Sequence, residues 1–227
     1  MIKWYYSLVI VVLMSACWQG KSNKSAISGE TQRLSGNVEA GRLLYNNTCK
    51  TCHGENGEGN LKFQAPALAN TDGWYLYRQL INYRNGIRGY DDHDTSAFQM
   101  AAMAKTLKDT IAVADVVAYI KIMPGVNISA AAVGDKKNGK NIYQSICGSC
   151  HGPNAIGNKK LNAPRLSGLN DWYLKTQIWK FKKSIRGAHP NDKLGAQMIT
   201  MMAMLPDEQS INDVIAYMQS AGEPVPQ

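Results

Sequence analysis

An internal repeat constrains the fold of this chain more than any other feature of its sequence. When the chain is shifted so that Cys49 falls on Cys147, its two halves align without a gap from Gly41 to Tyr119. The aligned pairs include Gly41 and Gly139, Tyr45 and Tyr143, Pro66 and Pro164, Trp74 and Trp172, Arg88 and Arg186, Met100 and Met198, and Asp115 and Asp213. A repeat with its landmarks in register indicates a duplicated structural unit. The sequence therefore predicts two tandem domains, 37–124 and 125–227, because Pro124-Gly125 ends a helix and starts a turn.

Each copy of the repeat is predicted to consist of helices and loops, since no long segment shows the two-residue period of a strand. Asn37 and Asp135 precede equivalent helical segments and are expected to be N-caps. Gly41 and Gly139 follow within the same helices, where the missing side chain would let the last helix of each copy cross closely. The predicted fold class is all-α.

Each copy also contains the motif Cys-x-x-Cys-His. The two instances are Cys49, Cys52 and His53, and Cys147, Cys150 and His151. A redox dithiol is disfavoured because redox Cys-x-x-Cys motifs lie between a strand and a helix, and because they need no adjacent histidine. Zinc is disfavoured because neither copy offers a second well-spaced pair of ligands. Covalent attachment of haem c requires two thiols for the vinyl groups and an adjacent imidazole for the iron, and each motif supplies all three groups. We predict two covalently attached haem c groups with His53 and His151 as axial ligands.

The sixth iron ligand decides what such a centre does. Iron held by histidine and methionine is coordinatively full and suits electron transfer, whereas an open site permits ligand or peroxide chemistry. Each copy has a methionine-rich segment, FQMAAMAKTL or AQMITMMAMLP, in which Met100 is equivalent to Met198 and Met103 to Met201. A soft thioether is an apt ligand, although methionines at helical spacing are more often core residues. The spacing alone does not choose between the two pairs.

With these motifs, the chain resembles the dihaem class I cytochromes c of the cytochrome c4 type over about 37–219. The resemblance implies two tandem class I cytochrome c domains, each a small helical fold around a covalently bound haem. It also implies that Met100 and Met198 are the axial ligands, because the family ligand precedes a leucine by seven residues, as these precede Leu107 and Leu205.

The same resemblance gives a role to two prolines. In the family, the carbonyl of a proline after the haem-binding loop accepts a hydrogen bond from the axial imidazole, and Pro66 and Pro164 occupy that position. Such a bond tunes the basicity of the ligand. The family also packs its two haem domains face to face, with the haem propionates near the interface.

The other candidate residues are two histidines and two arginines. His93 and His189 are not equivalent under the repeat, which disfavours both as axial ligands, and they are predicted to be surface residues. Arg88 and Arg186 each precede a glycine. Contact with a haem propionate and a solvated loop position are both open for them.

The net charge of +8 is spread along the chain, which favours an acidic partner or a membrane surface over nucleic acid. The first copy contains the acidic cluster Asp91-Asp92-Asp94, and the second contains Lys180-Lys182-Lys183. One hypothesis is that the two copies dock different redox partners through these charges. The alternative is that both clusters are solvated faces.

The N-terminus is predicted to be a secretion signal, 1–17, because the apolar run from Trp4 to Met14 is too short to span a bilayer. Its end, Met14-Ser15-Ala16-Cys17, resembles a bacterial lipobox, in which Cys17 is lipidated; ordinary cleavage near Ala16 is the alternative. Residues 18–36 are polar and are expected to form a flexible tether. The expected location is the bacterial periplasm, with the protein anchored to a membrane through Cys17.

These features predict an electron-transfer protein rather than an enzyme, without a small-molecule substrate. The expected donor is a quinol-oxidising complex or a dehydrogenase, and the expected acceptor is a terminal oxidase of a respiratory chain. The alternatives are the cytochrome subunit of a periplasmic dehydrogenase and a dihaem peroxidase. A peroxidase is disfavoured because it needs a displaceable sixth ligand and a His/His partner centre, whereas both copies keep the same methionine segment.

Overall fold

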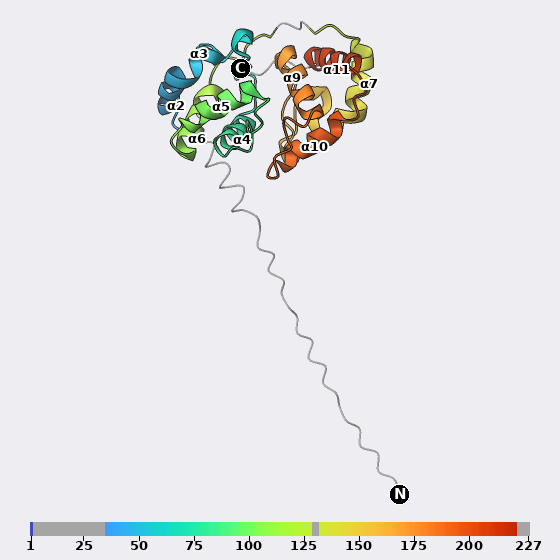
Figure 1. Cartoon of the computed structure of the whole chain (residues 1–227), viewed down its shortest axis with the longest axis horizontal. Helices are drawn as coiled ribbons and strands as arrows, with labels where there is room; N and C mark the ends of the chain where they lie inside the picture. The colour runs from blue at the N-terminus through green and yellow to red at the C-terminus, as the bar shows by residue number, and fades with distance from the viewer. Residues whose placement is uncertain (2–34, 129–131, 222–227) are drawn as a thin grey trace.

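Two helical units lie side by side in the computed structural model, which describes Met1 and residues 35–128 and 132–221 (Figure 1). The first unit comprises α2 (Val38–Leu44), the π-helical turn η1 (Tyr45–Cys49), α3 (Lys50–His53), the 3-10 turn η2 (Leu61–Phe63), α4 (Gly73–Arg84), α5 (Thr95–Lys105) and α6 (Thr110–Lys121). The second comprises α7 (Lys136–Ile142), η3 (Tyr143–Cys147), α8 (Gly148–His151), η4 (Pro153–Ala155), η5 (Lys159–Leu161), α9 (Asp171–Lys182), α10 (Lys193–Met202) and α11 (Glu208–Ala221). Within these ranges, β pairing is limited to isolated bridges between Asn60 and Ala65 and between Asn158 and Ala163, and the predicted all-α class is confirmed.

The N-terminal predictions concern a part of the chain that the structure does not describe. The signal segment 1–17 beyond Met1, its lipidation site Cys17 and the tether up to residue 34 lie outside the described residues. Among the helices within the described ranges, none has both the length and the apolar character that a bilayer crossing requires.

The first helix of each unit runs through a π-helical turn directly into the Cys-x-x-Cys-His motif. In the first unit α2 continues through η1, which ends at Cys49, into α3, which ends at His53. In the second unit α7 continues through η3, which ends at Cys147, into α8, which ends at His151. A π-helical turn takes in one more residue than an α-helical turn, so it rotates the residues that follow it about the helix axis.

The two predicted N-caps are confirmed. The side chain of Asn37 accepts a hydrogen bond from the backbone N–H of Ala40 (3.0 Å), and that of Asp135 accepts from Lys137 (2.8 Å) and Asn138 (3.2 Å). Each cap residue also binds the last helix of its unit. The backbone N–H of Asn37 donates to Asp115 (2.7 Å), and that of Asp135 donates to Asp213 (2.8 Å).

The predicted close crossing of the first and last helices is also present. A Cβ atom added at Gly41 would overlap the backbone carbonyl oxygen of Asp115 on α6, and one added at Gly139 would overlap that of Asp213 on α11. Glycine is therefore required at both positions by the approach of a neighbouring backbone.

A tyrosine at the centre of each core fixes the motif to the last helix. Tyr45 and Tyr143 are almost fully buried, and their rings pack against Tyr119 and Tyr217 with centroids 5.6 and 5.2 Å apart. Their hydroxyls donate to the carbonyls that directly follow the histidines, those of Gly54 and Gly152, both at 2.7 Å. The remaining core residues come mainly from the last helix of each unit, as in Val113, Val116, Val117 and Ile120, and in Ile211, Val214, Ile215 and Met218.

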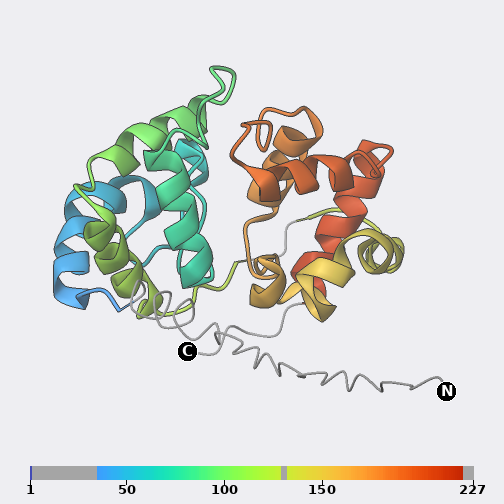
Figure 2. The ribbon, with the colours of Figure 1, turned by 90° about the horizontal axis from the view of Figure 1, so that it is seen from below.

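The two units contact each other almost symmetrically, through α4, α9 and the loops before these helices (Figure 2). The N–H of Ala67 donates to the side chain of Asn170 (2.9 Å), and the equivalent N–H of Arg165 donates to that of Asp72 (3.0 Å). Asn70 donates to the carbonyl of Gly168 (2.8 Å), the equivalent position of the repeat. Because the contact from Ala67 to Asn170 is repeated in the opposite direction from Arg165 to Asp72, the two units are related by an approximate two-fold axis. Asn70 contacts its own counterpart, so the axis lies close to it.

Candidate functional site

The two thiols and the imidazole of each motif lie on the short helix at the end of the first helical segment. His53 and His151 are buried, 7% and 6% exposed, while the cysteines range from buried Cys147 to exposed Cys150, and none of the four forms a disulfide. Burial raises the pKa of Cys49 to about 12, and likewise that of Cys147. A catalytic dithiol needs a lowered thiol pKa, so these values also speak against the redox alternative.

The structure places the predicted proline partners against both imidazoles. Nδ1 of His53 lies 2.9 Å from the carbonyl oxygen of Pro66, and Nδ1 of His151 lies 2.8 Å from that of Pro164. Because a carbonyl oxygen can only accept, Nδ1 carries the proton and Nε2 keeps its lone pair. Burial lowers the pKa of both imidazoles, more than the bond to the proline carbonyl raises it, which keeps them in the neutral form that binds metals.

A cavity of about 380 Å³ in the first unit brings the predicted ligands together. Cys49, Cys52 and His53 line one part of it, and Met100 and Met103 on α5 line another. Apolar side chains make up much of the remaining wall, among them Leu68, Leu76, Leu80, Leu107, Val116 and Ile120. An apolar cavity between a cysteine–histidine motif and a methionine helix fits a haem, whose porphyrin faces are apolar and whose iron takes a ligand on each side.

The second unit repeats this arrangement of ligands. Met198 and Met201 lie on α10 and pack, half-buried, against the core cluster that contains Tyr143, Cys147 and Leu205. α10 corresponds to α5, and α9 to α4, in chain order and in packing. Both methionines of each pair therefore remain close to their motif, and packing alone does not separate Met198 from Met201.

Residues of the second unit also reach the first cavity. Its lining includes Trp172, Tyr173, Thr176, Gln177 and Lys180, all on α9. The wall of the first site is therefore completed by the other unit.

Two buried arginines at the interface test whether the site fits a haem. Arg88 and Arg186 are each 7% exposed, so the solvated alternative for them is wrong. The guanidinium of Arg88 lies over the ring of Tyr83, 4.6 Å from its centroid, and that of Arg186 lies over the ring of Phe181, at 4.5 Å. Both arginines donate to the same two glutamines, one from each unit. Arg88 donates to Gln79 (2.7 Å), Gln177 (3.0 Å) and the hydroxyl of Tyr173 (3.5 Å). Arg186 donates to Gln177 (2.6 Å), Gln79 (3.1 Å) and the hydroxyl of Tyr75 (2.8 Å).

These two cations have no carboxylate partner within ion-pair distance among the residues that the structure describes. Nε of Arg88, moreover, is a buried donor without an acceptor. Buried charges are normally paired, and Arg88 lines the first cavity. Two unpaired guanidiniums and an orphan donor match the two propionate carboxylates that a haem carries, so the residues fit the group.

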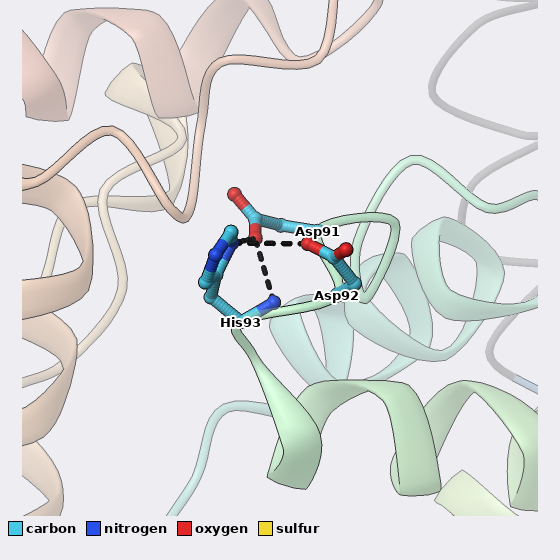
Figure 3. Close-up of side chains that lie close together, drawn as sticks. All are labelled: Asp91, Asp92 and His93. Atoms are coloured by element: carbon cyan, nitrogen blue, oxygen red, sulfur yellow. Dashed lines mark hydrogen bonds and ion pairs between the residues drawn. The ribbon is translucent and has the colours of Figure 1, made fainter.

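The two remaining histidines stay away from the cavity. His93 is exposed, and its Nδ1 lies 3.0 Å from carboxylate oxygens of both Asp91 and Asp92, in the loop before α5 (Figure 3). The hydrogen bond with Asp91 raises the pKa of His93. His189 is half-buried, its ring lies against Tyr90 (5.3 Å between centroids), and it accepts from the N–H of Asn191 (3.2 Å). Neither histidine lines the first cavity.

One part of the charge-docking hypothesis is wrong. The hypothesis assigns Asp94 and Lys180 to separate docking surfaces, but Nζ of Lys180 lies 2.6 Å from Oδ1 of Asp94 across the interface. Their side chains are 15% (Lys180) and 4% (Asp94) exposed, so neither is available to another protein. The sequence could not reveal this pair, because the two residues belong to different copies.

Comparison with known proteins gives two matches to one family model. The cytochrome c family model matches residues 38–124 and again 136–222. The "Thiosulfate dehydrogenase electron acceptor" of Stutzerimonas stutzeri is 28% identical over 185 residues, which cover 77% of this chain and 79% of that protein. "Cytochrome c4" of Thiocapsa roseopersicina is 27% identical, with 83% of this chain and 94% of that protein covered.

A longer relative and a solved structure complete the comparison. The "Cbb3-type cytochrome c oxidase subunit CcoP" of Azospirillum is 28% identical over 82% of this chain, and the chain spans only 62% of that subunit's length. The crystal structure of reduced cytochrome c4 from Pseudomonas stutzeri has a TM-score of 0.62 at 24% identity and covers 82% of this chain and 98% of that one. At that identity, the structural likeness concerns the fold alone.

Proposed function

Since this chain belongs to the cytochrome c family, with one family domain in each half, we propose that it carries single electrons from a dehydrogenase or a quinol-oxidising complex to a terminal oxidase. It is an electron-transfer dihaem cytochrome with two covalently attached haem c groups, one at each Cys-x-x-Cys-His motif. When bound, haem c supplies a one-electron couple of its iron. The donor and acceptor belong to the proposal, as do the roles of individual residues.

In each unit we assign two thiols, one imidazole and one thioether to the cofactor. Cys49 and Cys52, and Cys147 and Cys150, form the thioether links. His53 and His151 would bind the iron through Nε2, which the Nδ1 contacts to Pro66 and Pro164 support. Met100 and Met198 would supply the other iron ligands, which their places on α5 and α10 support.

The observation that carries the proposal is the recurrence of the imidazole–proline contact in both units, at 2.9 and 2.8 Å. It fixes which ring nitrogen is free, and it does so twice, in a chain whose two motifs face equivalent methionine helices. A centre filled by imidazole and thioether takes up and releases electrons without binding a substrate.

The names of the relatives support partners of the same classes. One relative is an electron acceptor of a thiosulfate dehydrogenase, and another is a subunit of a cbb3-type oxidase. The role of a cytochrome subunit in a periplasmic dehydrogenase remains the second candidate, because the same centres would serve it. A peroxidase is less well supported, since neither His93 nor His189 lines the first cavity to supply a second imidazole.

The proposed location is the bacterial periplasm, with the mature protein held at a membrane through lipidated Cys17 and the tether that follows it. An anchor of this kind raises the effective concentration of the carrier near membrane complexes. Labelling with radioactive palmitate, in the native chain and in Cys17→Ala, tests it: loss of label and release from the membrane fraction in the variant support lipidation. Unlabelled native protein would mean ordinary signal cleavage.

The experiment that tests the ligand assignment uses the holo-protein and its variants Met100→Ala and Met198→Ala. Each variant should lose the near-infrared methionine–iron band of one centre, and the reduced variant should bind carbon monoxide at that centre, whereas the native protein should not bind it. Met103→Ala and Met201→Ala serve as matched controls, from the same helices. If the controls lose the band and the first two variants keep it, the ligands are Met103 and Met201.

A further inference from the structure

The interface departs from two-fold symmetry at Lys180. Nζ of Lys180, on α9 of the second unit, donates to Oδ1 of Asp94 (2.6 Å) and to Oγ of Ser96 (2.8 Å) in the first unit. The position equivalent to Lys180 in the first unit is Asn82, whose side chain makes no such bond to Asp192, the counterpart of Asp94. A contact of this kind therefore exists in one direction only.

The contact falls on the first turn of the helix that carries Met100. Asp94 is the N-cap of α5: its Oδ1 also accepts the backbone N–H of Ala97 (3.0 Å). Met100 lies less than two turns further along the same helix and lines the first cavity, which Lys180 also lines. Oδ1 of Asp94 also accepts from the hydroxyl of Ser96 (3.2 Å), so the lysine adds a third bond to the group that caps the methionine helix.

The corresponding helix of the second unit has no hydrogen bond from the first unit at its N-cap among the described residues. The N-cap Asp192 of α10 accepts the N–H of Gly195 (2.8 Å), and no side chain of the first unit donates a hydrogen bond to it within the part of the chain that the structure describes; the charge of Arg78 acts on it without such a bond. Ser96, whose hydroxyl binds Lys180 in the first unit, has Leu194 as its counterpart in the second unit, and leucine offers no hydroxyl. The N-cap of the first methionine helix is therefore hydrogen-bonded across the interface, and that of the second is not.

We propose that Lys180 is a positioning residue for the first haem centre: through Asp94 and Ser96 it holds α5, and with it Met100, from the other unit. This inference rests on the proposed axial role of Met100. A buried carboxylate that loses its cation is destabilised, and a helix whose first turn is loosened opens more often. Without Lys180, the thioether of Met100 would therefore be held at the iron less firmly than in the native protein, whereas the hold on Met198 would not change.

The consequence is measurable as replacement of the thioether by an added ligand. In the oxidised holo-protein, imidazole displaces a soft thioether from the harder ferric ion. Stopped-flow mixing with imidazole should give two phases, which Met100→Ala and Met198→Ala assign, because each variant lacks one of them. Lys180→Met removes two hydrogen bonds to the first unit, so the phase of the first centre should become at least about two- to tenfold faster, the range for the loss of one ordinary hydrogen bond. The phase of the second centre should not change.

Lys175→Met is the matched control. Lys175 lies on the same helix and also makes a 2.6 Å ion pair with a carboxylate, that of Glu208, but within the second unit. It should leave the first phase unchanged. Asp94→Asn provides a second variant of the pair: asparagine remains a good N-cap, so the helix should form while the tie to Lys180 is weakened, and the first phase should again accelerate.

Hydrogen exchange gives a readout that does not depend on the ligand. In Lys180→Met, the amides of 95–105 should exchange faster, while those of 193–202 should keep their native rates. If both phases and both helices respond equally, or if Lys175→Met acts like Lys180→Met, the proposal is overturned. If Met100→Ala removes neither phase, the ligand assignment fails instead, and the exchange contrast alone then decides whether Lys180 holds α5.

Discussion

Nδ1 of His53 lies 2.9 Å from the carbonyl oxygen of Pro66, and the glycine that backs this peptide, Gly59, leaves no room for a side chain. A Cβ atom at Gly59, where φ is +82°, would lie 2.5 Å from the nitrogen of Ala67 and 2.7 Å from the carbonyl carbon of Pro66. The second unit repeats this arrangement at Gly157, with 2.6 Å to the nitrogen of Arg165. The bond to the imidazole therefore depends on a residue that does not itself touch it.

We expect Gly59→Ala to push the Pro66 peptide aside and to weaken its bond to His53. A weaker bond makes the imidazole a poorer donor to the iron, so the midpoint potential of the first centre should rise. Gly157→Ala should act in the same way on the second centre alone. Potentiometric titration followed by optical spectroscopy measures both.

Gly86→Ala is the control for backbone strain. Gly86 also has a positive φ, +68°, but nothing lies within 4 Å of an added Cβ. It should cost about 1–2 kcal/mol of folding free energy for the left-handed conformation and move neither potential. Equal shifts in Gly59→Ala and Gly86→Ala would show that strain, and not the proline carbonyl, sets the potential.

The two core tyrosines give a second prediction. In Tyr45→Phe the carbonyl of Gly54 loses the hydroxyl that lies 2.7 Å away, and in Tyr143→Phe the carbonyl of Gly152 loses its partner in the same way. A buried acceptor left without a donor costs about 1–3 kcal/mol, so each variant should lower the free energy of unfolding by that amount. Guanidinium denaturation measures the loss.

Tyr119→Phe is the matched control for this pair. The ring of Tyr119 packs against Tyr45, but its hydroxyl makes no hydrogen bond among the described residues. Removal of this hydroxyl should change the free energy of unfolding by less than about 0.5 kcal/mol, because it leaves no buried group without a partner and the ring stays in place. A loss as large as that of Tyr45→Phe would contradict the role given to the hydroxyl of Tyr45.

A third prediction concerns pH and the buried carboxylate of Asp213. Burial by itself would raise the pKa of Asp213, but hydrogen bonds from the side chain of Asn138, the backbone of Asp135 and the side chain of Gln209 outweigh it, and the pKa is lowered. A group with a lowered folded pKa stabilises the protein above its ordinary value of 3.8, and the stabilisation is lost as the pH falls through the folded value. The second unit should therefore lose stability below about pH 4.

The variant Asp213→Asn should be destabilised by about 1–3 kcal/mol at neutral pH, because its amide oxygen can replace Oδ1 but the NH2 group in place of Oδ2 cannot accept the bond from Asn138. The difference from the native protein should shrink as the pH falls below the ordinary carboxyl range. In the first unit, Asp115 accepts only from the N–H of Asn37 (2.7 Å) among the described residues, so Asp115→Asn should lose less. Thermal unfolding between pH 7 and pH 3 compares the two, and a constant difference over that range would refute the linkage.

Much of the fold was predictable because it depends on local rules repeated twice. The caps Asn37 and Asp135 follow from side chains placed before a helical run, and the close crossing follows from Gly41 and Gly139. The presence of two haem groups followed from the spacing of the cysteines and histidines, which chemistry fixes independently of the fold. A duplicated sequence strengthens each such prediction, since chance seldom repeats a pattern in register.

The interface could not be predicted in the same way. Arg88 and Arg186 precede glycines in loops, and their sequence is equally compatible with a solvated position; their burial depends on Gln177 and Gln79 from the opposite unit. The pair of Lys180 and Asp94 is hidden for the same reason, because each residue alone reads as one of a cluster of surface charges. The π-helical turns were also missed, since no periodicity in the sequence distinguishes them from an α-helical turn.

The last prediction concerns Asn70, the residue nearest the approximate two-fold axis. Its amide, 4% exposed, donates to the carbonyls of Val126 (2.7 Å) and Gly168 (2.8 Å), and its Oδ1 accepts the N–H of Val126 (3.0 Å). One side chain thus binds both the second unit and the segment that follows α6. We expect Asn70→Ala to leave these buried groups unpaired and to weaken the contact between the units, by about 1–3 kcal/mol for each unpaired group. Differential scanning calorimetry should then resolve two unfolding transitions where the native protein shows one.

Asn170→Ala, which removes a single contact between the units (2.9 Å to Ala67), should shift the transitions less, and Asn47→Ala on the exposed face of η1 should leave them unchanged. Native-like unfolding of Asn70→Ala would mean that the arginine and glutamine contacts hold the two units together without it.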